Sequence, residues 1–158
     1  MANTQSMCTS FMSELMTATH NFGTAPIRAA STADTFKAAL YLASATVNAS
    51  TTAYSSTGEV TGAGYTAGGV AVTNATPPAS TNTSATAGTA YWTPSASITY
   101  TSVTLPTAFD AVLIYNSTQS NKAVSVHTFG SQTVTAGTFT LTMPSNTTST
   151  ALLRLATT

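Results

Sequence analysis

Short stretches in which apolar and polar residues alternate recur along most of this chain of 158 residues. In the clearest stretch, Phe36, Ala38, Leu40 and Leu42 fall on one side and Lys37 falls on the other. Successive side chains of a β-strand point to opposite faces of a sheet, so this spacing predicts strands. The predicted strands cover residues 35–42, 70–72, 89–93, 97–105, 108–115, 122–129, 138–143 and 151–155.

These predicted strands, about eight in number, are separated by turn-forming residues, a pattern typical of all-β sandwiches and barrels. Their connections are uneven and sometimes long, which favours a jelly-roll-like β-sandwich over a simple meander. Pro94, Pro106 and Pro144 are expected to end strands, because proline cannot donate to a ladder. Residues 108–115 are apolar on both faces, so we expect a central strand that is covered on both sides.

One segment, residues 9–22, has apolar residues at helical spacing and is predicted as an N-terminal α-helix. Glu14 is expected in its first turn and His20 in its last turn, as a partly charged cap. The apolar face either covers the sheet or packs against another chain. We therefore expect residues 1–33 to form a helix and connector and residues 34–158 to form the β-sandwich, within a single globular domain.

Four glycines, Gly62, Gly64, Gly68 and Gly69, crowd the segment 59–72, in which turns run directly into a short strand. Tight and left-handed turns favour glycine, so a structural turn is predicted here. A phosphate-binding loop would end in a lysine and open a helix, and this segment does neither. We expect no nucleotide and no other cofactor.

Two long connections, residues 44–58 and 74–88, are polar and turn-rich and are predicted as exposed loops. The second contains two adjacent prolines and is a candidate arm that grips a neighbouring molecule. Together with the apolar face of the predicted helix, it forms the candidate interface. The candidate interface consists of Phe11, Met12, Leu15, Met16, Pro77 and Pro78.

Charged residues are scarce: they make up 5% of the chain, with four acids balanced by four bases. In an ordinary soluble domain, charged residues make up about 25% of the chain. Nucleic-acid binding needs clustered lysines or arginines, and membrane-surface binding needs a basic patch, so neither partner is expected. Cys8 is the single cysteine, so no internal disulfide is possible. The chain opens without the basic and apolar regions of a signal peptide, so secretion is not expected.

Residues that could carry out chemistry are few. Asp110, His127 and a serine could form a catalytic trio, but no serine lies in a Gly-X-Ser-X-Gly turn. Two histidines without a supporting cluster make a poor zinc site. We therefore expect no catalytic residues, no metal site and no enzyme activity. Asp110 is expected in a bulge or turn, or paired with Lys122 across a hairpin, and Trp92 is expected to pack in the core or at a sheet edge.

Several blocks of the chain, taken in order, carry a resemblance to a known group of proteins. The blocks are Phe11-Met12-Ser13-Glu14-Leu15 with His20-Asn21-Phe22, residues 34–41, Ala53-Tyr54, residues 59–69, residues 111–116 and residues 134–141. With these blocks the chain resembles a family of small virion proteins of tailed bacteriophages, over most of its length but not over residues 74–88. The resemblance implies a virion component from the head region and no catalytic residues.

Together, the low charge, the lack of a catalytic cluster and the resemblance imply a capsid decoration or cement protein. We expect it to form a homo-oligomer, to bind the major capsid protein on the outer surface of the capsid and to stabilise the shell through many simultaneous contacts. The alternative is a tail or fibre-associated adhesion component that binds a host glycan through an exposed aromatic platform of Tyr54, Tyr91 or Trp92. A third hypothesis, a hydrolase of the host envelope, requires Asp110 or His127.

Overall fold

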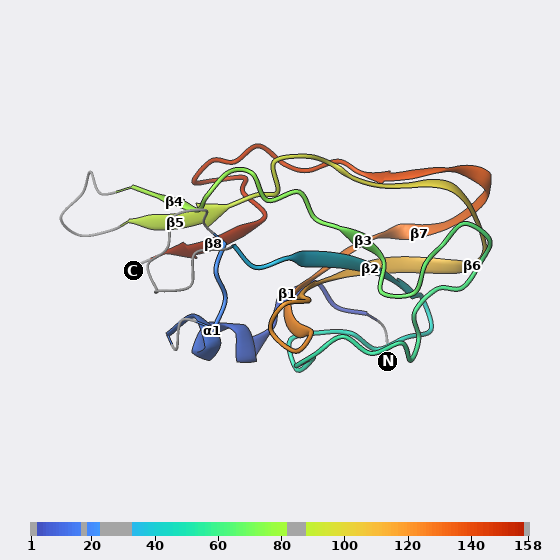
Figure 1. The fold of residues 1–158 in the computed structure, drawn as a ribbon, viewed down its shortest axis with the longest axis horizontal. Helices are drawn as coiled ribbons and strands as arrows, with labels where there is room; N and C mark the ends of the chain where they lie inside the picture. The colour runs from blue at the N-terminus through green and yellow to red at the C-terminus, as the bar shows by residue number, and fades with distance from the viewer. Residues whose placement is uncertain (1–2, 17–18, 23–32, 82–87, 157–158) are drawn as a thin grey trace.

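In a computed structural model of the protein, residues 3–16, 19–22, 33–81 and 88–156 are described. Within these ranges the chain forms two antiparallel sheets and one short helix, which confirms the all-β class. The larger sheet has the strand order β1-β7-β6-β2-β3, and the smaller sheet has the order β4-β5-β8 (Figure 1). The elements are β1 (Ser6–Met7), α1 (Thr9–Met16), β2 (Phe36–Leu42), β3 (Val70–Ala71), β4 (Ala79–Ser80), β5 (Thr89–Trp92), β6 (Ile98–Asn116), β7 (Lys122–Leu141) and β8 (Leu153–Ala156).

The longest strands, β6 and β7, form one hairpin that bends back over the larger sheet (Figure 1). We call the half of the hairpin next to its turn, where Asn116 pairs with Lys122, the lower arm, and this half lies beside β2 in the larger sheet. In the upper arm, Ile98 pairs with Leu141. The pairing register shifts four times between Tyr100 and the middle of β6. Such irregularities bend and twist a β-ribbon, and here they let one hairpin supply two layers.

Two pairs of predicted strands are therefore single strands. The predictions over residues 97–105 and 108–115 merge into β6, and those over 122–129 and 138–143 merge into β7. The expectation that Pro106 ends a strand is wrong. Pro106 is exposed and has no paired residue in β7, so its missing N–H costs no ladder hydrogen bond at this irregular point.

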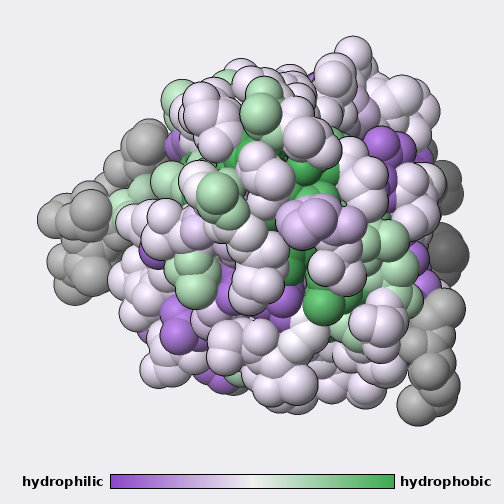
Figure 2. Space-filling model, turned by 90° about the vertical axis from the view of Figure 1, so that its right-hand side faces the viewer, coloured by the Kyte–Doolittle hydropathy of each residue, from purple (hydrophilic) through white to green (hydrophobic). Residues whose placement is uncertain are grey.

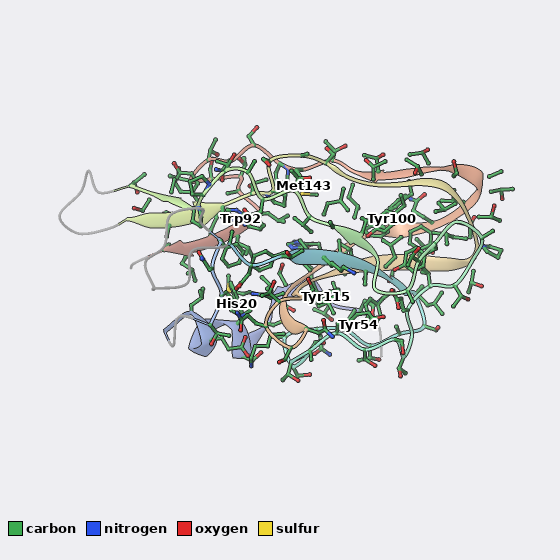
Figure 3. The ribbon with its side chains drawn as sticks, in the orientation of Figure 1. His20, Tyr54, Trp92, Tyr100, Tyr115 and Met143 are labelled. Atoms are coloured by element: carbon green, nitrogen blue, oxygen red, sulfur yellow. The ribbon has the colours of Figure 1, made fainter. Side chains whose placement is uncertain are left out.

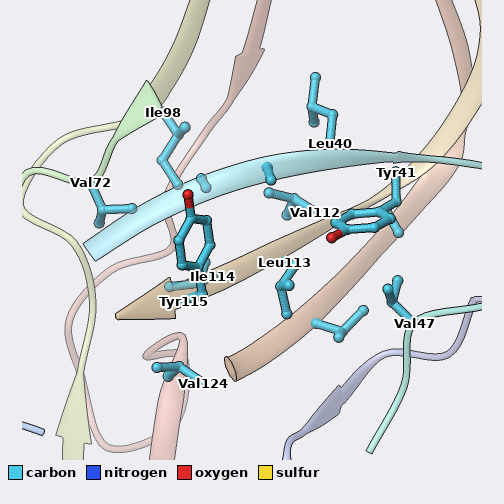
Figure 4. Close-up of a cluster of buried hydrophobic side chains, with 14 of the residues drawn as sticks. Leu40, Tyr41, Val47, Val72, Ile98, Val112, Leu113, Ile114, Tyr115 and Val124 are labelled. Carbon is cyan, nitrogen blue, oxygen red and sulfur yellow. The ribbon is translucent and has the colours of Figure 1, made fainter. Parts of the chain in front are cut away.

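Both faces of the larger sheet are covered by other parts of the chain. Figure 4 shows Leu40 and Ile98 above β2, and Leu113 and Val47 below it. Above the sheet, the hydroxyl of Tyr100 in the upper arm donates to a backbone oxygen of β2 at 2.8 Å. The six residues at the end of β6 are all buried, which confirms a central strand covered on both sides.

The N-terminal helix is shorter than predicted. α1 ends at Met16, and the chain from Thr19 to Phe22 is not helical, while residues 17–18 lie outside the described ranges. Phe22 turns inward instead and stacks on Phe36 of β2 with ring centroids 4.4 Å apart. Phe22 thus makes an aromatic contact with the sheet from a segment that does not continue α1. Glu14 also lies outside the first turn of α1, where it was expected.

The smaller sheet agrees with the predictions at β5 and β8, whose ends differ from the predicted strands by one or two residues. The prediction for residues 74–88 is corrected by β4, because this connection was expected to be an exposed loop and contains a strand. Its two residues pair with Tyr91 and Ala90 of β5. Residues 82–87 of the same connection lie outside the described part of the chain. Trp92 is buried, 3% exposed, which confirms that it packs in the core.

The glycine-rich segment crosses the larger sheet with its backbone in direct contact with neighbouring backbone. Positive φ angles occur at Gly64, Gly68 and Gly69. An added Cβ at Gly69 would lie 1.7 Å from the carbonyl oxygen of Ala38, and one at Gly62 would lie 2.0 Å from a backbone oxygen of β6. Any side chain at these two positions would push the segment off the sheet.

The same segment begins at a buried carboxylate, Glu59, which is 5% exposed. Its oxygens accept hydrogen bonds from the hydroxyls of Tyr54 and Tyr65, both at 2.7 Å, and from the N–H of Gly68 at 2.8 Å. The Tyr65 hydroxyl accepts in turn from the N–H of Leu40 at 3.0 Å. Burial and the hydrogen bond to this carboxylate raise the pKa of both tyrosines above the ordinary range. Glu59 therefore ties the segment to β2 through hydrogen bonds to neutral donors.

Replacing Glu59 tests how much this carboxylate contributes to the fold. Glu59→Ala leaves three donors without an acceptor, and we expect the free energy of unfolding to fall by at least about 3 kcal/mol. Tyr54→Phe, which removes one donor, should cost about 1 kcal/mol. Glu59→Gln keeps one acceptor oxygen, so its loss of unfolding free energy should lie between the losses of the other two variants. Urea denaturation measures all three, and equal midpoints for Glu59→Ala and Glu59→Gln would contradict this account.

Candidate interaction surface

An apolar hollow of about 90 Å³ opens between α1 and one face of the smaller sheet. α1 contributes Phe11 and Leu15, which lie one helical turn apart. The sheet contributes two directly opposed pairs on one face, because β5 and β8 align Ala90 with Leu155 and Trp92 with Leu153. The remaining lining residues are Met7, Phe22, Pro78, Tyr91 and Arg154. We call this feature the apolar hollow.

The deep wall of the apolar hollow is an aromatic cluster held in place by hydrogen bonds. Phe22 packs edge-on against Trp92, with ring centroids 4.8 Å apart, and against Phe11, with ring centroids 5.9 Å apart. The indole N–H of Trp92 donates to the side-chain oxygen of Asn74 at 2.8 Å. The Asn74 amide donates back to the carbonyl oxygen of Phe22 at 2.9 Å. The hollow is therefore a preformed feature of packed rings.

Three residues of the predicted interface meet in this hollow: Phe11, Leu15 and Pro78. Pro77 is exposed and does not line it, and the side chains of Met12 and Met16 lie outside what the structure describes. The predicted interface therefore included residues from both walls of the hollow, although these residues are far apart in the sequence.

The predicted interface did not include the other lining residues of the hollow, among them Trp92 and Leu155. The alternation of Leu153 and Leu155 marked a strand with one apolar face, and such a face is ordinarily covered. In the structure Leu155 is 42% exposed, the largest exposure among the described large apolar side chains. Alternation shows which side chains share a face, but not which of them stay uncovered.

The aromatic platform required by the adhesion alternative is not exposed. Trp92 is buried, and Tyr54 is half-buried and stacks on Tyr115 with ring centroids 4.7 Å apart (Figure 3). Tyr91 is also half-buried. A sugar ring would need an open aromatic face, which neither Trp92 nor Tyr54 offers.

A polar network holds α1 to the larger sheet. One oxygen of Glu14 accepts from the ammonium of Lys122 at 2.6 Å, and the other accepts from the imidazole of His20 at 2.7 Å.

The predicted pair of Lys122 with Asp110 is wrong, because Lys122 lies at the turn end of β7 and Asp110 lies well along β6. Asp110 accepts from the Asn3 amide at 2.5 Å instead. It stands at a register shift of β6, as the bulge alternative predicted.

The hydrogen bonds of Asn116 determine the protonation of His20. The Asn116 side-chain oxygen accepts from two backbone N–H groups of the following turn, both at 3.1 Å. Its NH₂ group must therefore donate, to Asp34 at 2.7 Å and to Nδ1 of His20 at 3.0 Å. Since Nδ1 accepts, the proton of His20 lies on Nε2 and is donated to Glu14. His20 is a neutral, buried link, and the expectation of a partly charged helix cap is wrong.

The surroundings shift the pKa of both partners in this link downward. Burial lowers the pKa of His20, although the hydrogen bond to Glu14 and its charge act in the opposite direction. Burial acts to raise the pKa of Glu14, but the hydrogen bonds and charges of Lys122 and His20 outweigh it and lower the pKa. Both groups are therefore held in the form that binds fewer protons.

The second histidine does not join a catalytic trio. Nε2 of His127 lies 2.9 Å from the hydroxyl of Ser125, two residues earlier on the same strand. Burial lowers the pKa of His127 to about 4. Asp110, the acid of the hypothetical trio, is bonded to Asn3. The structure pairs Ser125 with His127 and leaves Asp110 in a separate contact.

Among the described residues, no three His, Cys, Asp or Glu side chains are grouped so that they could hold a metal ion. In the same part of the chain, no helix is long and apolar enough to cross a membrane. Comparisons of the chain with protein-family models, with curated proteins and with solved structures find no match.

Acidification should destabilise the protein through His20, His127 and Glu14. All three have lowered pKa values in the folded state, so their contribution is largely present at pH 7 and is lost as the pH falls below the ordinary values of 6.5 for the histidines and 4.5 for Glu14. We expect the urea midpoint, followed by the emission of the single tryptophan Trp92, to fall between pH 7 and pH 4. A buried neutral histidine contributes a slope of up to about 1.4 kcal/mol per pH unit.

His20→Gln should flatten the upper part of this profile, between pH 6.5 and pH 5. His127→Gln is the matched control, because it removes the contribution of the other, half-buried histidine, which bonds Ser125, and should leave the contribution of His20, which bonds Glu14, in place. A midpoint that rises on acidification, or a His20→Gln profile identical to that of the wild type, would contradict the assigned protonation of His20.

Proposed function

We propose that this protein is a structural component of a tailed-bacteriophage virion, a capsid decoration or cement protein that binds the major capsid protein on the outer surface of the shell. The observation that carries the proposal is the apolar hollow, which opens at the surface of a scaffold with very few free charges. An apolar feature at the surface, with exposed Leu155 at its rim, fits a contact with another protein.

The use of the charged residues inside the molecule supports this proposal. Each of the four acids, Glu14, Asp34, Glu59 and Asp110, accepts hydrogen bonds from the chain itself. The surface that remains is largely threonine, serine and alanine. Figure 2 shows one end of the molecule, at the bend of the β6–β7 hairpin, where residues of near-neutral hydropathy predominate. Surfaces with little charge repel one another weakly, which favours dense packing of many copies on a shell.

Many weak contacts would then provide the binding strength. A homo-oligomer that engages several shell subunits at once gains affinity through effective concentration, with no single strong contact. We also propose that the two sheets form a jelly-roll-like sandwich, an arrangement supported by the hairpin that folds back over its own sheet. Jelly-roll sandwiches are common in viral capsid proteins.

One observation favours the alternative of a tail or fibre-associated adhesion component. A second cleft, of about 710 Å³, is lined mainly by polar side chains, among them Gln5, Thr89, Thr150 and Arg154. Its volume lies in the range of small-ligand sites, roughly 300 to 1,000 Å³. Hydroxyl and guanidinium groups are suitable partners for a sugar, so a glycan is the ligand that this alternative predicts.

Counting this chain in purified virions tests the proposal. A decoration protein should be present in a number comparable with that of the major capsid protein, because it covers the shell. Quantitative mass spectrometry of the virion, with gold-labelled antibody to locate the chain, measures both properties. We expect a high copy number and labelling of the head. A few copies per particle, or label on the tail alone, would refute the decoration role, and tail label would favour the adhesion alternative.

A further inference from the structure

In the described part of the chain, no further strand covers the edge of the smaller sheet beside the apolar hollow. All four residues of β8 pair with β5, and the strand order β4-β5-β8 places β8 at the edge. Within the described ranges, no residue pairs with the other side of β8. Three of its residues, Arg154, Leu155 and Ala156, are exposed. An edge strand of this kind presents unpaired backbone N–H and C=O groups to a partner.

The apolar hollow lies on one face of this open edge. Leu153 and Leu155 of β8 point into it, and its volume of about 90 Å³ suits one aliphatic side chain. For comparison, an engineered apolar cavity of roughly 150 Å³ holds a benzene molecule. A strand added beside β8 would direct alternate side chains to this face, so one of them would enter the hollow.

Arg154 defines the chemistry on the other face of β8. Because it alternates with Leu153 and Leu155, its side chain leaves β8 on the opposite face and donates to the carbonyl oxygen of Ser149 at 2.7 Å, while another part of the residue borders the apolar hollow. In the described part of the chain, no carboxylate pairs with it. The residue of an added strand next to the one in the hollow would face Arg154, and a carboxylate is its natural partner.

A second copy of this chain cannot easily supply that carboxylate. Glu59 and Asp34 are buried, Glu14 pairs with Lys122, and Asp110 accepts from Asn3. Releasing any of them would break contacts that hold the fold together. Charge complementarity therefore favours a different protein as the partner.

We propose that β8 binds an extended segment of a partner protein as an additional strand, with an aliphatic side chain in the apolar hollow and an acidic neighbour on Arg154. The inference rests on the proposed function, in which that partner is the capsid shell protein. Main-chain hydrogen bonds along β8 supply affinity, and the hollow and Arg154 supply specificity.

Synthetic peptides test this inference without the shell. The probe is an acetylated and amidated nine-residue peptide of alternating threonine and valine, with leucine at its centre and glutamate next to it. Trp92, the single tryptophan, lines the hollow and reports binding through its emission. Replacing the peptide's leucine by serine should weaken binding about tenfold or more. Replacing its glutamate by lysine should weaken binding about threefold, and N-methylation of alternate residues should abolish it.

Variants of the protein complete the test. Arg154→Glu should reverse the preference, so that the lysine peptide binds better than the glutamate peptide. Leu155→Asp should lose binding both to the peptide and to shells stripped of this chain, whereas Thr133→Asp, an exposed control on β7, should lose neither. Both substitutions are at exposed positions, so circular dichroism should show unchanged folding.

Three results would overturn the inference. One is peptide binding that is indifferent to Arg154→Glu or to the peptide's leucine. Another is self-association of the wild type that Leu155→Asp abolishes, which would make a second copy the occupant. The third is equal binding of the wild type and Leu155→Asp to stripped shells, which would leave the decoration role intact. Failure of the wild type itself to bind shells would instead refute the proposed function.

Discussion

A carboxylate that is buried without a cation must be surrounded by hydrogen-bond donors, and Glu59 meets this requirement with two tyrosine hydroxyls and one backbone N–H. One of the hydroxyls, that of Tyr65, also accepts from β2, so the requirement of a single side chain fixes the glycine-rich segment on the sheet. The missing side chains at Gly62 and Gly69 then allow backbone to lie directly on backbone. The upper face of the larger sheet is covered in this way, partly by a loop and partly by the upper arm of the hairpin.

The other charged groups are used in a similar way. The interior holds Glu14, Asp34 and His20 in hydrogen bonds to one another or to neighbouring amides. A chain with four acids and four bases that engages its acids internally has little charge left for its surface. In the interaction proposed above, recognition would rest on shape, on apolar contacts and on unpaired strand edges. The apolar hollow and the open edge of β8 provide these side by side.

The sequence predicts features that depend on residues close together in the chain better than contacts between residues that are far apart in it. Alternation over a few residues located β2, and a continuous apolar run located the buried end of β6, because both patterns are local properties of the chain. Local patterns failed at Pro106, where a bulged bend tolerates a residue that a regular ladder rejects. They also failed for the partner of Lys122, since Glu14 lies 108 residues away in the sequence.

The same distinction applies to the candidate site. Phe11 and Leu15 were predicted from helical spacing, and Pro78 from the composition of its loop, but the exposure of Leu155 depends on which elements cover it. That covering is a tertiary property. A pattern that marks an apolar face cannot show where the face remains open.

The apolar hollow and the polar network meet at α1. A helix of eight residues is too short to be stable alone, so its position depends on contacts at both of its sides. On one side, Glu14 connects it to Lys122 and His20, and on the other side Phe11 and Leu15 form a wall of the hollow. The shape of the hollow therefore depends on a hydrogen bond in which His20 is neutral. Protonation of His20 would place two donors against each other at Asn116, and the wall that α1 provides would lose one of its attachments.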